Sequence, residues 1–336
     1  MHLVRICGLA SALLLGTFLP AAAQDTCASS NVLGVSRVVE IDTSTGPKFG
    51  FQYSDANSFL AEGEVVLTFD DGPLRAYTKP VLEALAAQCT KATFFVVGRM
   101  AVADPEMVKE YARRGHTVGT HTWSHANLAH LSAPKARAEI EMGFSAVQNA
   151  MGKPIAPFFR FPYLSSSNTM AAHLHNRQIA TFSIDVDSKD YRTRDPGSVH
   201  RLIMGGLARS KKGILLFHDI QPSTARALPA LLADLKAKGY RIVHMRPKAA
   251  VATVAEFDSV VQSAADKKAA AAGGPLRRAV TWTVPLPPEL AGSKEDAAAQ
   301  DQATPGQKPG EPATPTRAPR RGATEEDWKA GLWRSY

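Results

Sequence analysis

A regular alternation of short apolar runs and amphipathic stretches is the feature that most limits how this chain folds. From about residue 64 to residue 252, runs such as Val65–Phe69 and Gly213–Phe217 are followed by stretches with helical spacing. Short apolar runs rich in β-branched residues are typical of buried strands, and strands that alternate with helices form parallel sheets. Fewer than eight strand–helix units are clear, so we expect an α/β fold of the distorted or incomplete (β/α) barrel type.

The expected elements follow one another through this region. We expect strands at Val65–Phe69, Ala92–Val97, Val118–Thr120, Phe158–Phe161, Ile179–Ile184, Gly213–Phe217 and Tyr240–Val243. We expect helices at Pro80–Ala87, Pro105–Arg114, Ala133–Met151, Val199–Arg209 and Ala225–Lys238. Gly115, Gly152 and Gly239 follow three of these helices, where a glycine commonly ends a helix.

The chain divides by composition into four regions. Residues 1–23 have the layout of a secretory signal peptide, with a basic start, an apolar run and small residues at the end. Residues 24–62 form a polar N-terminal arm with a short strand-like run at Ser36–Ile41, and residues 63–252 form the main α/β domain. Residues 253–336 are rich in Ala, Pro and charge, and we expect this tail to be mostly disordered.

The signal peptide predicts export, to the periplasm or the outside of the cell. No later run is long and apolar enough to span a bilayer, so we expect no stable membrane anchor. Cys7 lies in the segment that is removed, which leaves Cys27 and Cys89. Because export leads to an oxidising compartment, we expect a disulfide between these two cysteines. The alternative is that both are unpaired and that Cys89 packs as a small apolar residue.

The chain is basic, with 39 Lys and Arg against 31 Asp and Glu and a net charge of +8. Such a charge is compatible with attraction to anionic cell-wall polymers or membranes. The basic residues are scattered and are not interleaved with aromatic residues in a groove-like pattern, so we expect no nucleic-acid partner. We expect a monomer.

Two clusters of potential metal ligands lie where strands are expected to end. Asp70 and Asp71 follow the first buried strand, and two adjacent carboxylates repel each other unless a cation or a proton lies between them. His121 and His125 follow a second strand and, at a spacing of i and i+4, are expected to share one face of a helical turn. Two imidazoles and one carboxylate leave coordination positions open, as catalytic metal sites do.

Five motifs in a fixed order extend this pattern. Together they resemble the polysaccharide deacetylases with the NodB homology domain, also called carbohydrate esterase family 4, and the resemblance covers roughly residues 62–250. The motifs are Phe69–Gly72, His121–His125, Arg160–Tyr163, Asp187–Tyr191 and Leu215–His218. The resemblance implies the distorted barrel of that family. One departure is Tyr191, because the fourth motif of the family usually ends in Trp.

The resemblance also implies a metal site and a catalytic base. Asp71, His121 and His125 would bind the metal, which is usually zinc, with cobalt or manganese as alternatives. Asp70 would act as the base that takes a proton from the attacking water. Arg160 would hold the carboxylate of this base in place.

The same resemblance assigns the proton donor and the walls of the substrate site. His218 would protonate the departing amine, and Asp190 would keep His218 protonated. The backbone N–H of Tyr163, preceded by Pro162, would bind the oxyanion. Leu216 would line the pocket for the acetyl methyl group, and Tyr191 would form part of the groove wall.

The function implied is removal of N-acetyl groups from an N-acetylglucosamine-containing polysaccharide. Peptidoglycan, chitin oligomers and poly-N-acetylglucosamine all remain open as substrates. One alternative is an acetyl-ester hydrolase of the xylan type on the same scaffold. Another is a catalytically silent glycan-binding protein.

Overall fold

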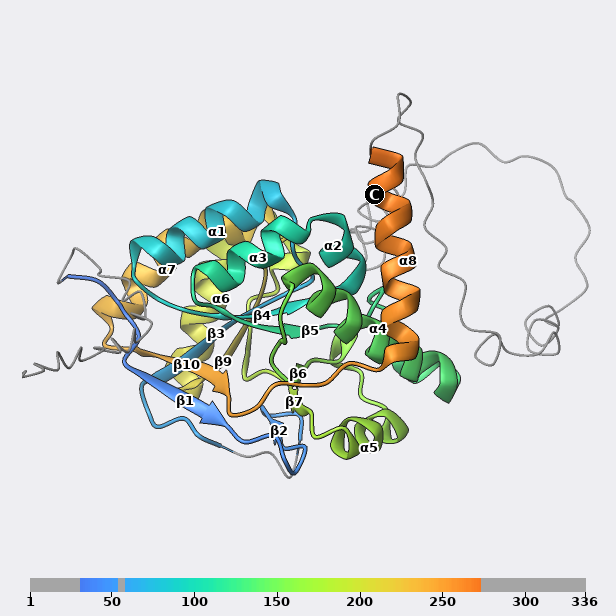
Figure 1. Ribbon diagram of the computed structural model, residues 1–336. Helices are drawn as coiled ribbons and strands as arrows, with labels where there is room; N and C mark the ends of the chain where they lie inside the picture. Colours follow the sequence, from blue (N-terminus) through green and yellow to red (C-terminus); the bar gives the residue numbers. More distant parts are fainter. Residues whose placement is uncertain (1–30, 54–57, 273–336) are drawn as a thin grey trace, which may run out of the picture. The chain divides into compact units, whose positions relative to one another are not determined.

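Ten strands pair side by side in the part of the chain that the computed structural model describes, residues 31–53 and 58–272 (Figure 1). Every ladder between them is parallel. The strands are β1 (Arg37–Ile41), β2 (Lys48–Phe49), β3 (Glu64–Asp70), β4 (Thr93–Val96), β5 (Thr117–Thr120), β6 (Phe158–Phe159), β7 (Ala180–Phe182), β8 (Val186–Asp187), β9 (Gly213–His218) and β10 (Arg241–Pro247).

The order of the strands is that of an incomplete barrel. Strands β3 to β7 pair in sequence, and on its other side β3 pairs with β9, which in turn pairs with β8. Within the described residues no ladder joins β7 to β8, so the barrel is open there. This confirms the expected distorted (β/α) barrel. Strands β10 and β1 extend the sheet from β3, and β2 pairs with β7.

Strand β3 shows how the sequence sorts side chains between the barrel interior and the helical layer. Because successive side chains of a strand point to opposite faces, Val65, Leu67 and Phe69 share one face. All three are fully buried in the apolar cluster that includes residues of the surrounding helices. The intervening residues, among them Thr68 and Asp70, therefore point into the barrel interior.

The described part of the chain contains eight helices, which surround the strands or, as with α8, pack on another helix (Figure 1). They are α1 (Arg75–Ala87), α2 (Gly98–Ala103), α3 (Pro105–Arg113), α4 (Ala133–Met151), α5 (Asn168–Asn176), α6 (Pro196–Ser210), α7 (Pro222–Ala237) and α8 (Ala255–Ala272). Three short 3-10 turns, η1 (Leu128–His130), η2 (Pro162–Leu164) and η3 (Asp190–Arg192), interrupt the loops. Helix α1 starts upstream of the expected Pro80, because Thr78 N already donates to Leu74 O at 2.8 Å.

The folded region extends beyond the expected boundaries at both ends. Strands β1 and β2 lie in the predicted arm and pair with β10 and β7. Helix α8 lies in the predicted tail and packs alongside α4 (Figure 1), where Phe257 and Val261 are fully buried. Helical structure therefore continues to Ala272, past the expected boundary at residue 252. An alanine-rich composition suggests disorder, but alanine favours helices, and the apolar residues of α8 share one face.

Three expectations reach beyond the described residues. The predicted signal peptide at residues 1–23 and the tail after residue 272 lie outside them. Cys89 has a φ of 52° after α1 and is disulfide-bonded, whereas its predicted partner Cys27 lies outside the described residues, so the Cys27–Cys89 pairing stays a prediction. Among the described helices, none is both long and apolar enough to cross a membrane.

Candidate active site

The two adjacent carboxylates lie at the carboxyl end of β3, in different backbone conformations. Asp70 is the last residue of the strand and keeps its inward direction. Asp71 has a φ of 75°, and its backbone N–H donates to Phe95 O at 3.2 Å. Non-glycine residues rarely adopt this left-handed conformation. Both carboxylates reach the same imidazole, with Asp70 Oδ2 at 3.8 Å and Asp71 Oδ1 at 3.6 Å from His121 Nε2. Both carboxylates are buried.

The two histidines lie on an irregular loop after β5 and not on the helical turn expected from their spacing. Thr122 and His125 have φ values of 69° and 61°, which no α-helical turn contains. The turn is closed by a hydrogen bond from His125 N to Thr122 Oγ1 at 3.0 Å. The loop nevertheless aims both imidazoles in one direction, and their ring centroids are 4.9 Å apart.

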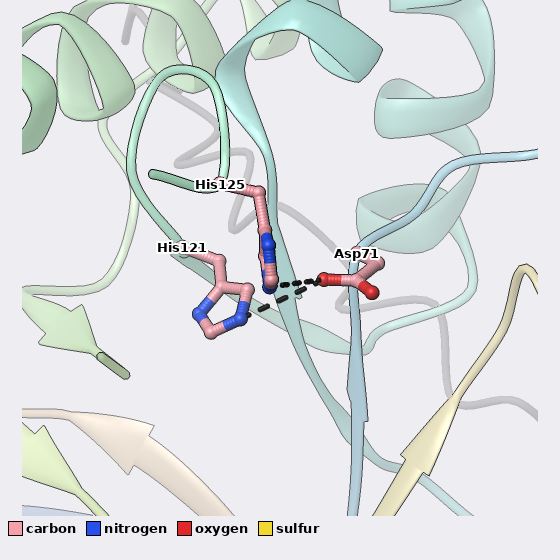
Figure 2. Close-up of side chains that lie close together, drawn as sticks. All are labelled: Asp71, His121 and His125. Carbon is pink, nitrogen blue, oxygen red and sulfur yellow. Dashed lines mark ion pairs between the residues drawn. The ribbon is translucent and has the colours of Figure 1, made fainter. Parts of the chain in front are cut away.

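Asp71, His121 and His125 converge on one point (Figure 2). Asp71 Oδ1 lies 3.2 Å from His125 Nε2 and 3.6 Å from His121 Nε2. His121 Nδ1 lies 2.7 Å from the carbonyl oxygen of Arg160. Because a carbonyl only accepts, Nδ1 must carry the hydrogen, which leaves the Nε2 lone pair facing Asp71.

This cluster fits a divalent cation. Asp71 Oδ1 is buried and has no hydrogen-bond partner, which is costly unless a cation lies nearby. Burial, with a smaller contribution from His125, holds the pKa of His121 well below its usual value, so the imidazole is a neutral ligand. Ligand atoms about 2.0–2.2 Å from a tetrahedral zinc ion lie about 3.4 Å from one another, close to the two distances above.

Arg160 fixes the carboxylate of Asp70 from within the barrel. Its Nη1 donates to Asp70 Oδ1 at 2.7 Å and to Thr68 Oγ1 at 2.8 Å. The guanidinium is fully buried and lies over the ring of Phe95, at 4.3 Å from its centroid. Burial raises the pKa of Asp70 to about 6, against the opposing charges of Arg160 and His218.

His218 and Asp190 form a second charged pair, beside Asp70 at the carboxyl edge of the barrel. His218 is the last residue of β9 and is the register partner of Asp70 in the neighbouring strand. Its Nδ1 lies 2.7 Å from Asp190 Oδ1, and its backbone N–H donates to Asp190 Oδ2 at 2.7 Å. Thr224, at the start of α7, donates its hydroxyl to the same Oδ2. Burial lowers the pKa of His218, but Asp190, with smaller contributions from Asp71 and Asp70, raises it to about 10.

The remaining predicted residues surround this edge. Tyr163 follows the buried Pro162 in η2 with a φ of 60°, and its ring meets that of His125 edge-on at 4.8 Å. Tyr191 meets the His218 ring edge-on at 5.5 Å and donates its hydroxyl to Asp187 Oδ2 at 3.0 Å. Leu216 is buried on β9, two residues before His218.

Four neighbours of these residues were not predicted. Thr68 lies two residues before Asp70. Because alternate residues of a strand share a face, the sequence could have placed Thr68 beside Asp70. No motif marks Thr224 or Gln52. Thr224 lies at the start of α7 and Gln52 lies in the N-terminal arm, both outside the five motifs. Asp219 is fully buried and accepts hydrogen bonds from Tyr111 at 2.5 Å and Thr78 at 2.6 Å.

Gln52 links two loops of the site. Its Nε2 donates to Leu164 O at 3.1 Å, and its Oε1 accepts from Ser183 Oγ at 2.7 Å. Ser183 O in turn accepts from Arg160 Nη2 at 3.1 Å. One side chain of the arm therefore connects the Tyr163 loop to the backbone that supports Arg160.

Comparison with known proteins is consistent with this geometry. A family model described as polysaccharide deacetylase matches residues 60–181. A chitooligosaccharide deacetylase of Bradyrhizobium is 30% identical over 193 residues, which are 53% of this chain and 87% of that protein. A peptidoglycan-N-acetylglucosamine deacetylase of Listeria monocytogenes is 34% identical over 179 residues, covering 53% of this chain and 37% of that protein. The chain thus spans little more than a third of the length of this relative.

A solved structure has a similar fold. The peptidoglycan deacetylase of Bdellovibrio bacteriovorus superimposes with a TM-score of 0.59 at 32% sequence identity. The match covers 66% of this chain and 61% of that chain.

Proposed function

This chain belongs to the polysaccharide deacetylase family, and we propose that its site hydrolyses N-acetyl groups of an N-acetylglucosamine-containing polysaccharide such as peptidoglycan or a chitin-like glycan. One observation carries the proposal. Three groups meet at one edge of the barrel: the buried carboxylate of Asp70, the cation site that includes Asp71, and His218, whose pKa is raised. Amide hydrolysis needs such a set, because water must lose a proton and the amine must gain one.

Asp71, His121 and His125 would hold the metal ion, and we propose zinc, with cobalt or manganese as the alternatives. When bound there, the ion lowers the pKa of water and polarises the acetamide carbonyl.

Asp70 acts as the general base in this proposal. Its Oδ1 is occupied by Arg160, so the ion pair fixes which way the carboxylate faces. Asp70 Oδ2 lies 3.8 Å from His121 Nε2, which places it beside the cation site. The second carboxylate oxygen is therefore the one aimed at the attacking water.

His218 acts as the general acid. The carboxylate of Asp190 fixes Nδ1, so Nε2 is the nitrogen that donates a proton to the leaving amine. A pKa of about 10 keeps His218 protonated at neutral pH. Because Asp70 and His218 end adjacent parallel strands, base and acid approach the scissile bond from two sides.

The substrate-binding roles follow from position. The backbone N–H of Tyr163, in the loop beside His125, would donate to the oxyanion. Leu216 supplies an apolar wall for the acetyl methyl group. Pro162 holds the entry to the Tyr163 turn, and Tyr191 forms the wall beside His218.

We also propose export by the signal peptide at residues 1–23, to the periplasm or the outside of the cell. The folded catalytic domain then starts within the arm at β1 and ends at α8. The predicted Cys27–Cys89 disulfide would join the arm to the end of α1.

The experiment is acetate release from a panel of substrates by the zinc-loaded protein. Peptidoglycan, chitin oligomers and poly-N-acetylglucosamine represent amides, and acetylated xylan represents the ester alternative. We expect acetate from at least one amide substrate at a rate well above that from xylan. Faster release from xylan would identify an esterase, and tight glycan binding with no acetate from any substrate would identify a silent binding protein.

A further inference from the structure

Four exposed cations lie around η3, next to the proposed general acid. The segment after Asp187 carries Lys189, Arg192 and Arg194, all exposed. A fourth cation, Arg226 on α7, donates from Nη2 to Arg194 O at 2.6 Å, which ties it to the same loop. We call these four residues, Lys189, Arg192, Arg194 and Arg226, the cationic rim.

The rim borders the site through Tyr191. This residue lies between Lys189 and Arg192 in the chain, and its ring packs edge-on against His218 at 5.5 Å. The next residue after Lys189 is Asp190, the partner of His218. The rim thus belongs to the loop that holds the acid, at the carboxyl edge of the barrel.

Few carboxylates compensate the charge of the rim. Among the described residues, none of the four cations forms an ion pair with an acidic side chain. Asp190 is buried against His218, whose charge it balances. Asp187 accepts from two neutral donors, the Tyr191 hydroxyl and the backbone of Lys189, so its charge offsets one of the four cations. Asp195 binds the first turn of α6 and pairs with Arg201 at 3.3 Å. The rim therefore keeps a net positive charge, and cations grouped at one place attract anions over about 10 Å at moderate salt.

We propose that the cationic rim selects an anionic glycan, one that carries carboxylates close to the N-acetylated sugar, over a neutral polymer. This inference rests on the proposed function, because it concerns the substrate of the same site. A neutral N-acetylglucosamine oligomer offers the rim no charge. Glycan strands with carboxylates on neighbouring sugars or attached peptides place anions beside His218 when an acetamide occupies the site.

The chain offers a charge-matched control. Arg209 and Lys211 are also exposed and also lack an ion pair among the described residues. They lie at the far end of α6, about 22 Å along the helix from η3 at 1.5 Å per residue. They precede the amino end of β9, opposite His218. Replacing them changes the net charge equally and leaves the rim intact.

The test compares Arg192→Gln/Arg194→Gln with Arg209→Gln/Lys211→Gln. Two substrates differ only in charge: peptidoglycan strands, and the same strands whose carboxylates are converted to carboxamides with carbodiimide and ammonia. At low salt we expect the rim variant to lose about three- to tenfold in kcat/KM on the anionic strands and to match wild type on the amidated strands. The control variant should match wild type on both, and high salt should remove the difference.

An equal loss by the rim variant on both substrates would overturn the inference, since it would show a structural effect. An equal loss by the control variant would overturn it too, since only net charge would matter. No loss by the rim variant on anionic strands would show that the rim plays no part in selection. Failure of the proposed function looks different, because wild type would then release no acetate from either substrate.

Discussion

Arg160 and Asp70 form a buried ion pair, with Nη1 and Oδ1 2.7 Å apart, on the inner face of the barrel. The guanidinium also donates to the carbonyls of Phe182 and Ser183 and to Thr68. A single side chain therefore connects strands β3, β6 and β7 at the level of the proposed base. The orientation of Asp70 and the packing of the barrel depend on the same residue.

We predict that Arg160→Met lowers the free energy of unfolding by about 3–5 kcal/mol, because Asp70 is left as an uncompensated buried charge. Denaturant titration of the metal-free protein measures this. Adding Asp70→Asn to Arg160→Met should recover part of the loss, since the buried charge is then removed. A double variant no more stable than Arg160→Met would contradict the assignment.

Asp70→Asn should reduce deacetylation by at least about 10²-fold, because general base catalysis typically contributes 10²–10⁴-fold. Zinc content after dialysis should stay close to that of wild type, since the proposed ligands are Asp71, His121 and His125. His125→Ala should lower both the rate and the zinc content. Wild-type turnover by Asp70→Asn would exclude Asp70 as the base.

Asp190→Asn should shift the basic limb of the pH profile to lower pH. His218 must be protonated to act as the acid, and Asp190 is the main group that raises its pKa to about 10. Without that carboxylate, burial lowers the pKa, so activity is lost at a lower pH. The measurement is kcat/KM between pH 5 and about 11. An unchanged basic limb would show that another group donates the proton.

Gln52→Ala should lower kcat about three- to tenfold with little change in KM. Gln52 holds the carbonyl of Leu164, which follows Tyr163 at a φ of 54°, and such left-handed conformations persist only when neighbouring contacts hold them. A misplaced oxyanion donor affects the transition state more than substrate binding. Gln262→Ala on the exposed face of α8 is the control. A rise in KM with kcat unchanged would assign Gln52 to substrate binding instead.

Local patterns predicted much of the fold. Helix α4 ends at Met151, as expected from Gly152, whose φ of 72° suits glycine. Alternation in β3 and β9 likewise anticipates that Asp70 and His218 point into the barrel, because side-chain direction in a strand depends only on the period of two. A helix end and the direction of a strand side chain depend only on a few neighbouring residues, so both can be predicted from the sequence.

Features that depend on tertiary contacts were not predicted. The His121–His125 segment has helical spacing but adopts positive φ values at Thr122 and His125. Glu139 on α4, outside the segment, accepts from the backbone N–H groups of Trp123 and Ser124. Helix α8 needs α4 to cover its apolar face. The strand-like run at Ser36–Ile41 indicates β1, but its pairing with β10, about 200 residues later, has no local signal. The contact of Gln52 with Leu164 joins positions 112 residues apart, which no local pattern encodes.

The central claim is metal-dependent N-deacetylation, and zinc reconstitution tests it most directly. The protein is stripped with a chelator, dialysed and assayed with and without added zinc, and both acetate and new primary amine are measured. The account predicts almost no product from the stripped protein and recovery with zinc, with acetate and amine appearing in equal amounts. Undiminished release from the stripped protein, or acetate without matching amine, would contradict it.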